Sequence, residues 1–167
     1  MPPPQPTPYS AWVIMGVSGC GKSTVARALA NAMGLAFADA DDFHPPENVA
    51  KMSRGVALED EDRWPWLDKL SDWLGEESPC VLACSALKKS YRARLSRHNH
   101  QFRFVHLQVD ENTLKRRMET REHFMPASLL KTQFETLETP TESEALILDG
   151  TLPVDQLVAA IVSDARR

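Results

Sequence analysis

The stretch Gly16-Val17-Ser18-Gly19-Cys20-Gly21-Lys22-Ser23 follows an apolar run at residues 11–15. It matches the phosphate-binding pattern G-x-x-x-x-G-K-[ST] at every fixed position. Its glycines allow positive φ angles, so the backbone N–H groups and the start of the next helix can converge on a phosphate. An ordinary glycine-rich turn is the alternative. The strand-like run before the loop and the helical pattern after it favour a site for a nucleoside triphosphate.

Residues in and around this loop have distinct expected roles. Lys22 is expected to reach the β- and γ-phosphates, and the Ser23 hydroxyl is expected to bind Mg²⁺. Residues 23–34 show a helical apolar pattern that stops at Gly34. The loop residues expected to bind ATP are Gly16, Val17, Ser18, Gly19, Cys20, Gly21, Lys22, Ser23 and Thr24.

Length and composition indicate one ordinary globular domain. The 167 residues are 43% hydrophobic and 25% charged, which is enough for a sizeable core. The formal net charge of −4 argues against general nucleic-acid binding, because that function needs a cationic surface. No apolar stretch approaches the roughly 20 residues of a membrane span. We therefore expect neither a nucleic acid nor a membrane as a partner, and a cytoplasmic location.

The proline-rich start and the cysteines are expected to be peripheral to the chemistry. Residues 1–8 lack the basic and apolar regions of a signal peptide, so residues 1–10 are predicted to be a disordered leader and 11–167 a single domain. Cys20, Cys80 and Cys84 make an odd count, which disfavours a disulfide framework. Buried free thiols are the expected state, and the C-x₃-C spacing is only a weak zinc signal.

An acidic pair follows the second strand-like run, residues 35–38. Asp39 and Asp41 stand at its carboxyl end, which is where open α/β sheets bind ligands. One carboxylate would support a metal ion and the other would contact an acceptor hydroxyl. The alternative is that Asp39 caps a turn while Asp41 and Asp42 are solvated charges. His44 follows as a ligand, a substrate contact or a structural residue.

Basic residues occur on two later helical patterns. Lys88 and Arg92 lie four residues apart, so they either project together toward an anion or form a solvated helix face. Two short helical patterns suggest a lid at about residues 116–137, which would bring Arg117 and Arg121 onto developing charge. A solvated helix face is again the alternative for these arginines.

Strand-like and helical patterns alternate along the chain. The apolar runs lie at residues 11–15, 35–38, 79–85, 102–109 and 145–149. Helical patterns separate them, as in βαβ units. The sequence therefore predicts an α/β fold with a five-stranded parallel sheet flanked by helices on both faces.

Further stretches add a specific combination of residues. They are Asp39-Ala40-Asp41-Asp42-Phe43-His44-Pro45, Asn48, Lys51-Met52, Gly55, Asp60-Glu61-Asp62-Arg63, Pro65-Trp66-Leu67, Cys84-Ser85-Ala86-Leu87-Lys88, Tyr91-Arg92, His123-Phe124-Met125-Pro126, Leu129-Leu130, Gln133 and Thr136-Leu137-Glu138. Together with the phosphate loop, they resemble the small gluconokinases among the P-loop kinases. The chain departs from that family at Glu122, where a glycine is usual and one residue is missing, and peripherally at Ala57 and Ala93.

The resemblance implies a P-loop kinase fold similar to that of nucleoside monophosphate kinases, with a helical lid. It implies transfer of the γ-phosphoryl group of ATP to the 6-hydroxyl of D-gluconate, and a homodimer. Asp41 would orient or deprotonate that hydroxyl, with Lys22 on the phosphoryl group and Asp39 supporting Mg²⁺. The candidate cations for the gluconate carboxylate are, in order, Lys51, Arg63, Lys88 and Arg92. His44 would contact a hydroxyl, and Arg117 and Arg121 would serve the nucleotide.

Two other functions remain open from the sequence. One keeps the fold but changes the acceptor to shikimate, a nucleoside monophosphate or another sugar acid. The pair of Asp39 and Asp41 suits a hydroxyl better than a phosphate acceptor, since carboxylates repel a monophosphate. The other is an ATP-binding switch without phosphoryl transfer, which would be expected to lack the acceptor carboxylates or the lid arginines.

Overall fold

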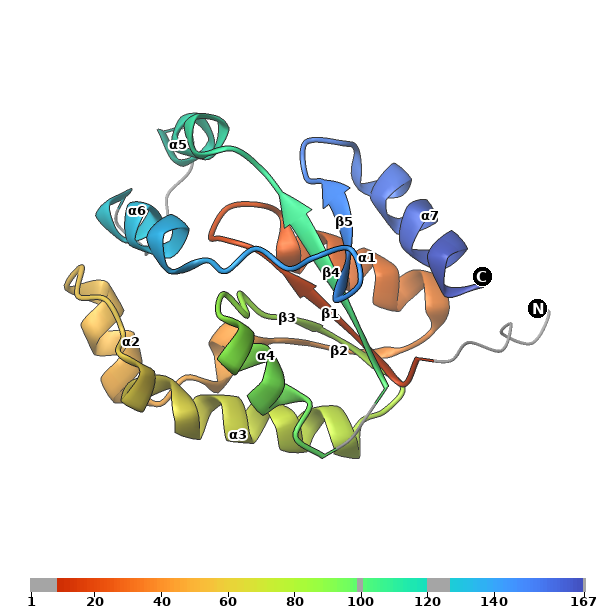
Figure 1. Ribbon diagram of the computed structural model, residues 1–167, viewed down its shortest axis with the longest axis horizontal. Helices are drawn as coiled ribbons and strands as arrows, with labels where there is room; N and C mark the ends of the chain where they lie inside the picture. Colours follow the sequence, from red (N-terminus) through yellow and green to blue (C-terminus); the bar gives the residue numbers. More distant parts are fainter. Residues whose placement is uncertain (1–8, 99–100, 120–126, 167) are drawn as a thin grey trace.

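A computed structural model describes residues 9–98, 101–119 and 127–166, without the side chains of 118–119 and 127–129. Five parallel strands form one sheet in the order β2-β3-β1-β4-β5 (Figure 1). The strands are β1 (Ala11–Met15), β2 (Ala36–Asp39), β3 (Cys80–Ala83), β4 (Phe102–Gln108) and β5 (Ala145–Asp149). The predicted α/β fold with a five-stranded parallel sheet is therefore confirmed.

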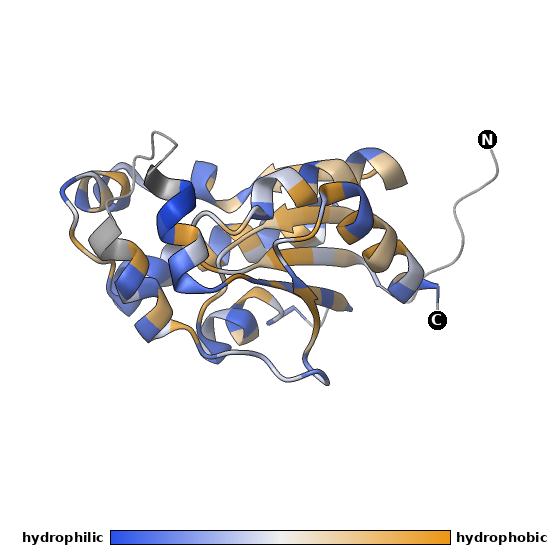
Figure 2. Cartoon of the chain, turned by 90° about the horizontal axis from the view of Figure 1, so that it is seen from above, coloured by the Kyte–Doolittle hydropathy of each residue, from blue (hydrophilic) through white to orange (hydrophobic). Residues whose placement is uncertain are grey.

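Helices cover both faces of this sheet. They are α1 (Lys22–Met33), α2 (Pro46–Ser53), α3 (Asp60–Glu76), α4 (Lys89–Leu95), α5 (Glu111–Glu119), α6 (Ala127–Thr136) and α7 (Val154–Ala165). Helices α1 and α7 pack together on one face, whereas α3 and α4 pack together on the other (Figure 1). The apolar strands lie between these helical layers in Figure 2, which places the core along the sheet.

Strand β1 is the centre of the sheet because its sequence is apolar on both faces. All five of its residues have a relative exposure of 0%. It pairs in parallel with β3, where Ala11 faces Cys80, and with β4, where Ala11 faces Phe102. A continuous apolar run of this kind is typical of a parallel strand that helices cover on both sides.

The carboxyl ends of the strands meet at one edge of the sheet, since all five strands are parallel. The phosphate loop follows β1 at this edge, and Asp39 ends β2 there. The loop after β3 is tied to the same edge, because the Gly16 N–H donates to the Ser85 carbonyl at 3.3 Å. This arrangement brings residues that are distant in sequence around one point.

Helix α3 packs with α4 on one face of the sheet. It begins with a capping box: the Glu59 side chain accepts the Asp62 N–H, and the Asp62 side chain accepts the Glu59 N–H. Trp66, Leu67, Leu70 and Leu74 are buried along one face, so this face of the helix belongs to the core.

The three cysteines are buried and free, as predicted. Burial raises the pKa of the Cys80 and Cys84 thiols to about 12, because desolvation disfavours the thiolate. The described part of the chain holds no group of three or more His, Cys, Asp or Glu residues suited to a metal ion. The zinc alternative therefore has no support there.

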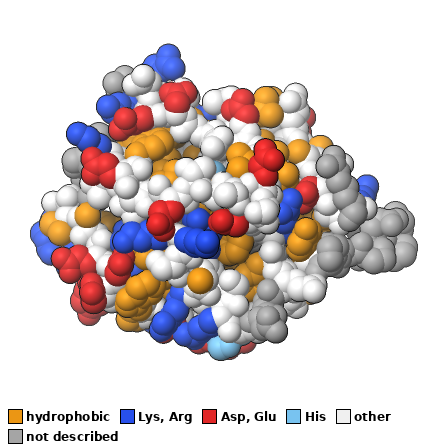
Figure 3. Space-filling view, in the orientation of Figure 1, with side chains coloured by type: hydrophobic (Ala, Val, Ile, Leu, Met, Phe, Trp, Pro, Cys, Tyr) orange, Lys and Arg blue, Asp and Glu red, His pale blue; other side chains and the backbone are white. Residues whose placement is uncertain are grey.

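The surface of the domain carries charges of both signs (Figure 3). Figure 3 shows Lys and Arg side chains interspersed with Asp and Glu on the face in view. Within residues 9–98, 101–119 and 127–166, no helix is long and apolar enough to cross a membrane.

Residues 1–8 of the expected leader lie outside the described residues. Ser10, at the end of the predicted leader, contacts the domain, because its N–H donates to the Gln101 carbonyl at 2.8 Å.

Candidate active site

The phosphate loop has the backbone that its glycines permit. Gly16 has φ = 147°, and a Cβ there would lie 2.7 Å from the Cys20 Sγ and 3.0 Å from the Leu107 carbonyl oxygen. Gly21 has φ = 99° and caps the start of α1 in the left-handed conformation. These positions therefore need glycine, for space at the first and for conformation at the second.

The loop is held from within and from the lid region. The Lys22 Nζ donates to the Val17 carbonyl at 3.2 Å, which folds the side chain back over the loop. The Arg117 guanidinium of α5 donates to the carbonyls of Gly19 at 3.1 Å and Gly150 at 3.4 Å. Arg117 thus lies against the phosphate loop, as its predicted nucleotide role requires.

Asp39 links the phosphate loop to the acidic segment after β2. One of its carboxylate oxygens accepts a short hydrogen bond from the Ser23 hydroxyl. The other accepts the Asp41 N–H at 2.9 Å and so caps a 3₁₀ turn at Ala40–Phe43. Two hard oxygen donors in contact suit Mg²⁺, which takes few protein ligands and completes its shell with water and phosphate oxygens. The residues present therefore fit the predicted ion.

A cleft at the carboxyl edge of the sheet brings six of the predicted site residues together. We call it the central cleft. The predicted residues that line it are Ser18, Lys22, Asp39, Asp41, His44 and Arg63. Trp66, Ser85, Thr132 and Gln133 also line it, and the sequence assigned no site role to them. Trp66, Ser85 and Gln133 stood within the family-like stretches, which was the only signal that could have indicated them.

Asp41 lines this cleft as an exposed residue. Protein atoms nevertheless surround its carboxyl, and desolvation raises its pKa. The nearby Lys22 ammonium acts in the opposite direction, while the charges of Asp39 and Asp42 raise the pKa further. A carboxylate with a raised pKa is a stronger base than an ordinary aspartate, which suits a proton acceptor.

His44 lies flat against Trp66. Their ring centroids are 4.1 Å apart with an interplanar angle of 13°, and the Trp66 indole N–H donates to the Ala40 carbonyl at 2.7 Å. Burial, with the Arg63 charge adding to it, lowers the pKa of His44 to about 4. His44 is therefore neutral near pH 7, so it can serve a substrate hydroxyl but not a carboxylate as a cation.

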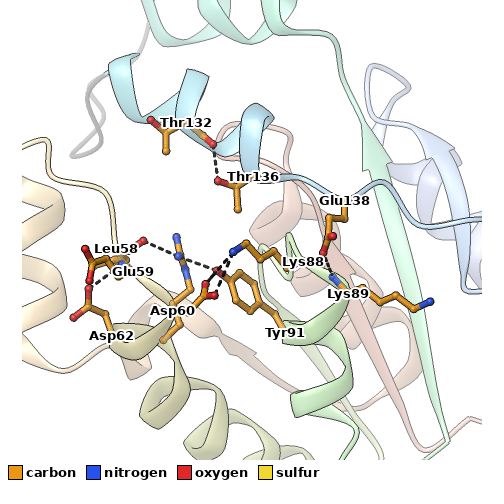
Figure 4. A network of polar contacts seen from close by, with 11 residues as sticks. Leu58, Glu59, Asp60, Asp62, Lys88, Lys89, Tyr91, Thr132, Thr136 and Glu138 are labelled. Carbon is orange, nitrogen blue, oxygen red and sulfur yellow. Dashed lines mark hydrogen bonds and ion pairs between the residues drawn. The ribbon is translucent and has the colours of Figure 1, made fainter.

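A network of polar contacts fixes Arg63 in the cleft. Its guanidinium donates to the Leu58 carbonyl at 2.7 Å and to the Tyr91 hydroxyl at 3.0 Å. The Tyr91 hydroxyl in turn donates to Asp60, which also accepts from the Lys88 Nζ at 3.1 Å (Figure 4). Lys88 thus neutralises Asp60. The hydrogen bonds to the Leu58 carbonyl and the Tyr91 hydroxyl orient the guanidinium of Arg63.

Three of the four predicted carboxylate partners lie elsewhere. Lys51 pairs with Asp62 at 2.9 Å, and neither it nor Lys88 is among the described residues that line the cleft. The Arg92 side chain is only 5% exposed. Its guanidinium donates to the carbonyls of Ala86, Leu87 and Glu138, at 2.7, 3.2 and 2.9 Å.

The predicted projection of Lys88 and Arg92 toward one anion is therefore corrected. Spacing four apart puts two residues on one side of a helix, but here Lys88 precedes α4 and turns to Asp60, whereas Arg92 turns inward. Arg92 instead ties the loop after β3 to the segment that follows α6.

We expect the Arg92→Met variant to lose about 2–4 kcal/mol of unfolding free energy, because two buried carbonyls and one half-buried carbonyl lose a charged donor. Urea unfolding monitored by circular dichroism would measure the loss. Arg94→Met on the same helix is the control: Arg94 pairs with Asp68 at 2.6 Å near the surface, so its loss should stay below about 1 kcal/mol. Equal losses in the two variants would contradict the buried role of Arg92.

The two short helices predicted for the lid are present as α5 and α6. Arg121 and the segment at residues 120–126 lie outside the described residues, so the role of Arg121 and the limits of the lid at about 116–137 stay predictions. Helix α6 contributes Thr132 and Gln133 to the central cleft. The Ser18 N–H of the phosphate loop donates to the Gln133 Oε1 at 2.6 Å.

Comparisons with known proteins agree with this geometry. A family model described as an AAA domain matches residues 13–126. A gluconokinase of Gluconobacter oxydans (strain 621H) is 49% identical over 140 residues, which are 81% of this chain and 79% of the relative. The crystal structure of a gluconokinase from Sinorhizobium meliloti 1021 has a TM-score of 0.85 and 45% identity, and the match covers 95% of this chain and 92% of that one.

A more distant structure matches in fold alone. The shikimate kinase of Aquifex aeolicus is 16% identical, with a TM-score of 0.61 over 92% of this chain and 94% of that one. The Sinorhizobium meliloti structure, in contrast, is similar to this chain in both sequence and fold. The chain belongs to the gluconokinase family.

Proposed function

We propose that this protein transfers the γ-phosphoryl group of ATP to the 6-hydroxyl of D-gluconate, giving 6-phospho-D-gluconate and ADP. One observation carries the proposal: Lys22 of the phosphate loop, Asp41 and Arg63 line the same cleft. Such a cleft provides a cation for the transferring group, a base for a hydroxyl and a cation for a carboxylate. Gluconate is an acceptor that carries both a hydroxyl and a carboxylate.

Asp41 is proposed to accept the proton of the 6-hydroxyl while the hydroxyl oxygen forms a bond to the γ-phosphorus. The bond from that phosphorus to the β–γ bridging oxygen breaks, and ADP leaves. Lys22 lies where its ammonium group can stabilise negative charge on the phosphoryl oxygens. Electrostatic stabilisation of this kind is usually the largest contribution that a protein makes to phosphoryl transfer. The raised pKa of Asp41 supports its role, because it makes the carboxylate a better proton acceptor at neutral pH.

Mg²⁺ is proposed to bind between the Ser23 hydroxyl and the Asp39 carboxylate, with phosphate oxygens and water as further ligands. When bound, the ion neutralises charge on the phosphates. Arg117 is proposed to contact the nucleotide beside Gly19, and Arg121 to act from the lid. By resemblance to the family we also expect a homodimer and a cytoplasmic location.

Arg63 is proposed to bind the gluconate carboxylate, with neutral His44 as a hydroxyl partner. We expect Arg63→Met to raise the KM for gluconate about 10-fold or more, since a charged hydrogen bond is worth about 1.5–3 kcal/mol. The KM for ATP should stay near the wild-type value. Steady-state kinetics with each substrate varied in turn would measure both.

Lys51→Met is the matched control for Arg63. Lys51 pairs with Asp62 and has no place in the cleft lining, so its loss should leave the KM for gluconate near wild type. A larger effect at Lys51 than at Arg63 would restore the order that the sequence suggested and overturn the assignment of Arg63.

A coupled assay of ADP release tests the function itself. The assay would compare gluconate, shikimate, AMP and no acceptor at saturating Mg·ATP. Release with gluconate alone supports the proposal. A faster rate with shikimate or another acceptor would replace the substrate but keep the kinase, and ATP binding without release on any acceptor would favour the switch.

A further inference from the structure

The Gln133 side chain connects helix α6 to the phosphate loop. The Gln133 Oε1 accepts the Ser18 N–H at 2.6 Å, although the two residues are 115 positions apart. The Gln133 side chain is half-buried, and it lines the central cleft together with Ser18, Lys22 and Asp41. The Gln133 amide oxygen therefore contacts the phosphate loop within the central cleft.

The donor in this hydrogen bond belongs to the loop that binds phosphate. Backbone N–H groups of such a loop converge on phosphate oxygens when nucleotide is bound. A neutral amide oxygen at hydrogen-bond distance from one of them satisfies that donor, which would otherwise be costly to leave without an acceptor. One N–H makes one good hydrogen bond, so a phosphate oxygen and the Gln133 oxygen compete for Ser18.

The place of Ser18 indicates which phosphate is involved. Ser18 lines the same cleft as Asp41, while Arg117 contacts Gly19 and Gly150, which lie outside the cleft lining among the described residues. The phosphate nearest to the acceptor must be the one that is transferred. The competition therefore concerns the γ-phosphate and leaves the phosphates of ADP nearly untouched.

We propose that Gln133 is a positioning residue whose side-chain oxygen takes the place of a γ-phosphate oxygen at Ser18 and yields to it when ATP binds. The exchange connects α6 to the presence of a γ-phosphate and lets the enzyme distinguish ATP from ADP. Glutamine suits this role because a glutamate of the same length would repel the arriving phosphate. The inference deepens the proposed kinase function and rests on it.

The Gln133→Met variant tests the competition. Isothermal titration calorimetry would measure binding of Mg·AMP-PNP, a non-hydrolysable ATP analogue, and of Mg·ADP, with no acceptor present. We expect AMP-PNP to bind about 3- to 10-fold more tightly than to the wild type, which is the range of one net hydrogen bond. The affinity for ADP should change by less than about 2-fold.

Two further variants keep the test decisive. Gln133→Glu preserves the side-chain length and the acceptor, so it should weaken AMP-PNP binding at least about 10-fold and ADP binding much less. Lys131→Met changes an exposed residue of the same helix and should alter neither affinity. Thermal unfolding of each variant would show that the protein is folded.

The ratio of the AMP-PNP and ADP affinities decides the outcome. A merely structural role of Gln133 would shift both affinities together, and that result, or an unchanged ratio in both Gln133 variants, would overturn the inference. Binding is measured without gluconate, so a failure of the gluconate assay leaves this result unaffected. The two proposals can therefore fail separately.

Discussion

The Lys22→Ala variant is expected to lose phosphoryl transfer almost completely, with kcat reduced by about 10²–10³-fold or more. The loss follows from the position of the ammonium group, which caps the loop through the Val17 carbonyl and faces the cleft beside Asp41. Removing a preorganised charge from the transferring group has effects of this size in other enzymes. Reactions at saturating gluconate and Mg·ATP, quenched at set times and assayed for ADP, would give kcat.

The control for this variant is Lys69→Ala. Lys69 is exposed on α3, so its loss removes the same charge from the protein without touching the cleft. Its kcat should equal that of the wild type. A Lys22→Ala enzyme with a rate close to that of the control would refute the role of Lys22.

The Asp41→Asn variant is expected to bind ATP nearly as tightly as the wild type while kcat falls about 10²–10⁴-fold. Asparagine keeps the size of the side chain but cannot accept the hydroxyl proton, and a positioned base contributes a factor of this order. Calorimetry with Mg·AMP-PNP and steady-state rates would separate binding from catalysis. Asp42→Asn, at the exposed neighbouring position, is the control and should stay active.

The pH dependence should identify the same residue. A base must be ionised, so the rate falls as the pH drops through the pKa of Asp41, and burial raises that pKa above its ordinary value of 3.8. The acid limb should therefore begin at a higher pH than an ordinary aspartate would give. His44, whose pKa is lowered to about 4, adds its own protonation to this limb. In Asp41→Asn the contribution of Asp41 to this limb should disappear, and an acid limb identical to that of the wild type would assign the base to another group.

The sequence alone predicted the parts of this molecule that depend on local pattern. The runs at 11–15 and 145–149 became β1 and β5 without change, since continuous apolar residues have one favourable place in an α/β sheet. The glycine spacing predicted the shape of the phosphate loop, because few other residues tolerate the backbone at Gly16 and Gly21. Asp39 caps a turn, which was one of the two roles weighed for it, and it also accepts a hydrogen bond from Ser23. Its role toward Mg²⁺ stays a prediction.

The parts that depend on tertiary partners could not be predicted. The sequence offered four cations for one carboxylate, and nothing in their spacing showed that Lys51 meets Asp62 or that Lys88 meets Asp60. The inward turn of Arg92 depends in part on the Glu138 carbonyl, which the segment after α6 brings from far along the chain. Tyr91 and Gln133 stood in family-like stretches, but their roles become visible only when α4 and α6 are placed around the cleft.

The central position of β1 has a consequence for the order in which the protein acquires its shape during synthesis. This strand leaves the ribosome before its two neighbours in the sheet, which begin at Cys80 and Phe102. Its five apolar residues therefore lack their strand partners until these later segments have been made, and an apolar segment stays exposed to aggregation in the meantime. The nucleotide-binding loop directly follows this strand, yet it is completed only when Ser85, Arg117 and Gln133 have been made and hold it.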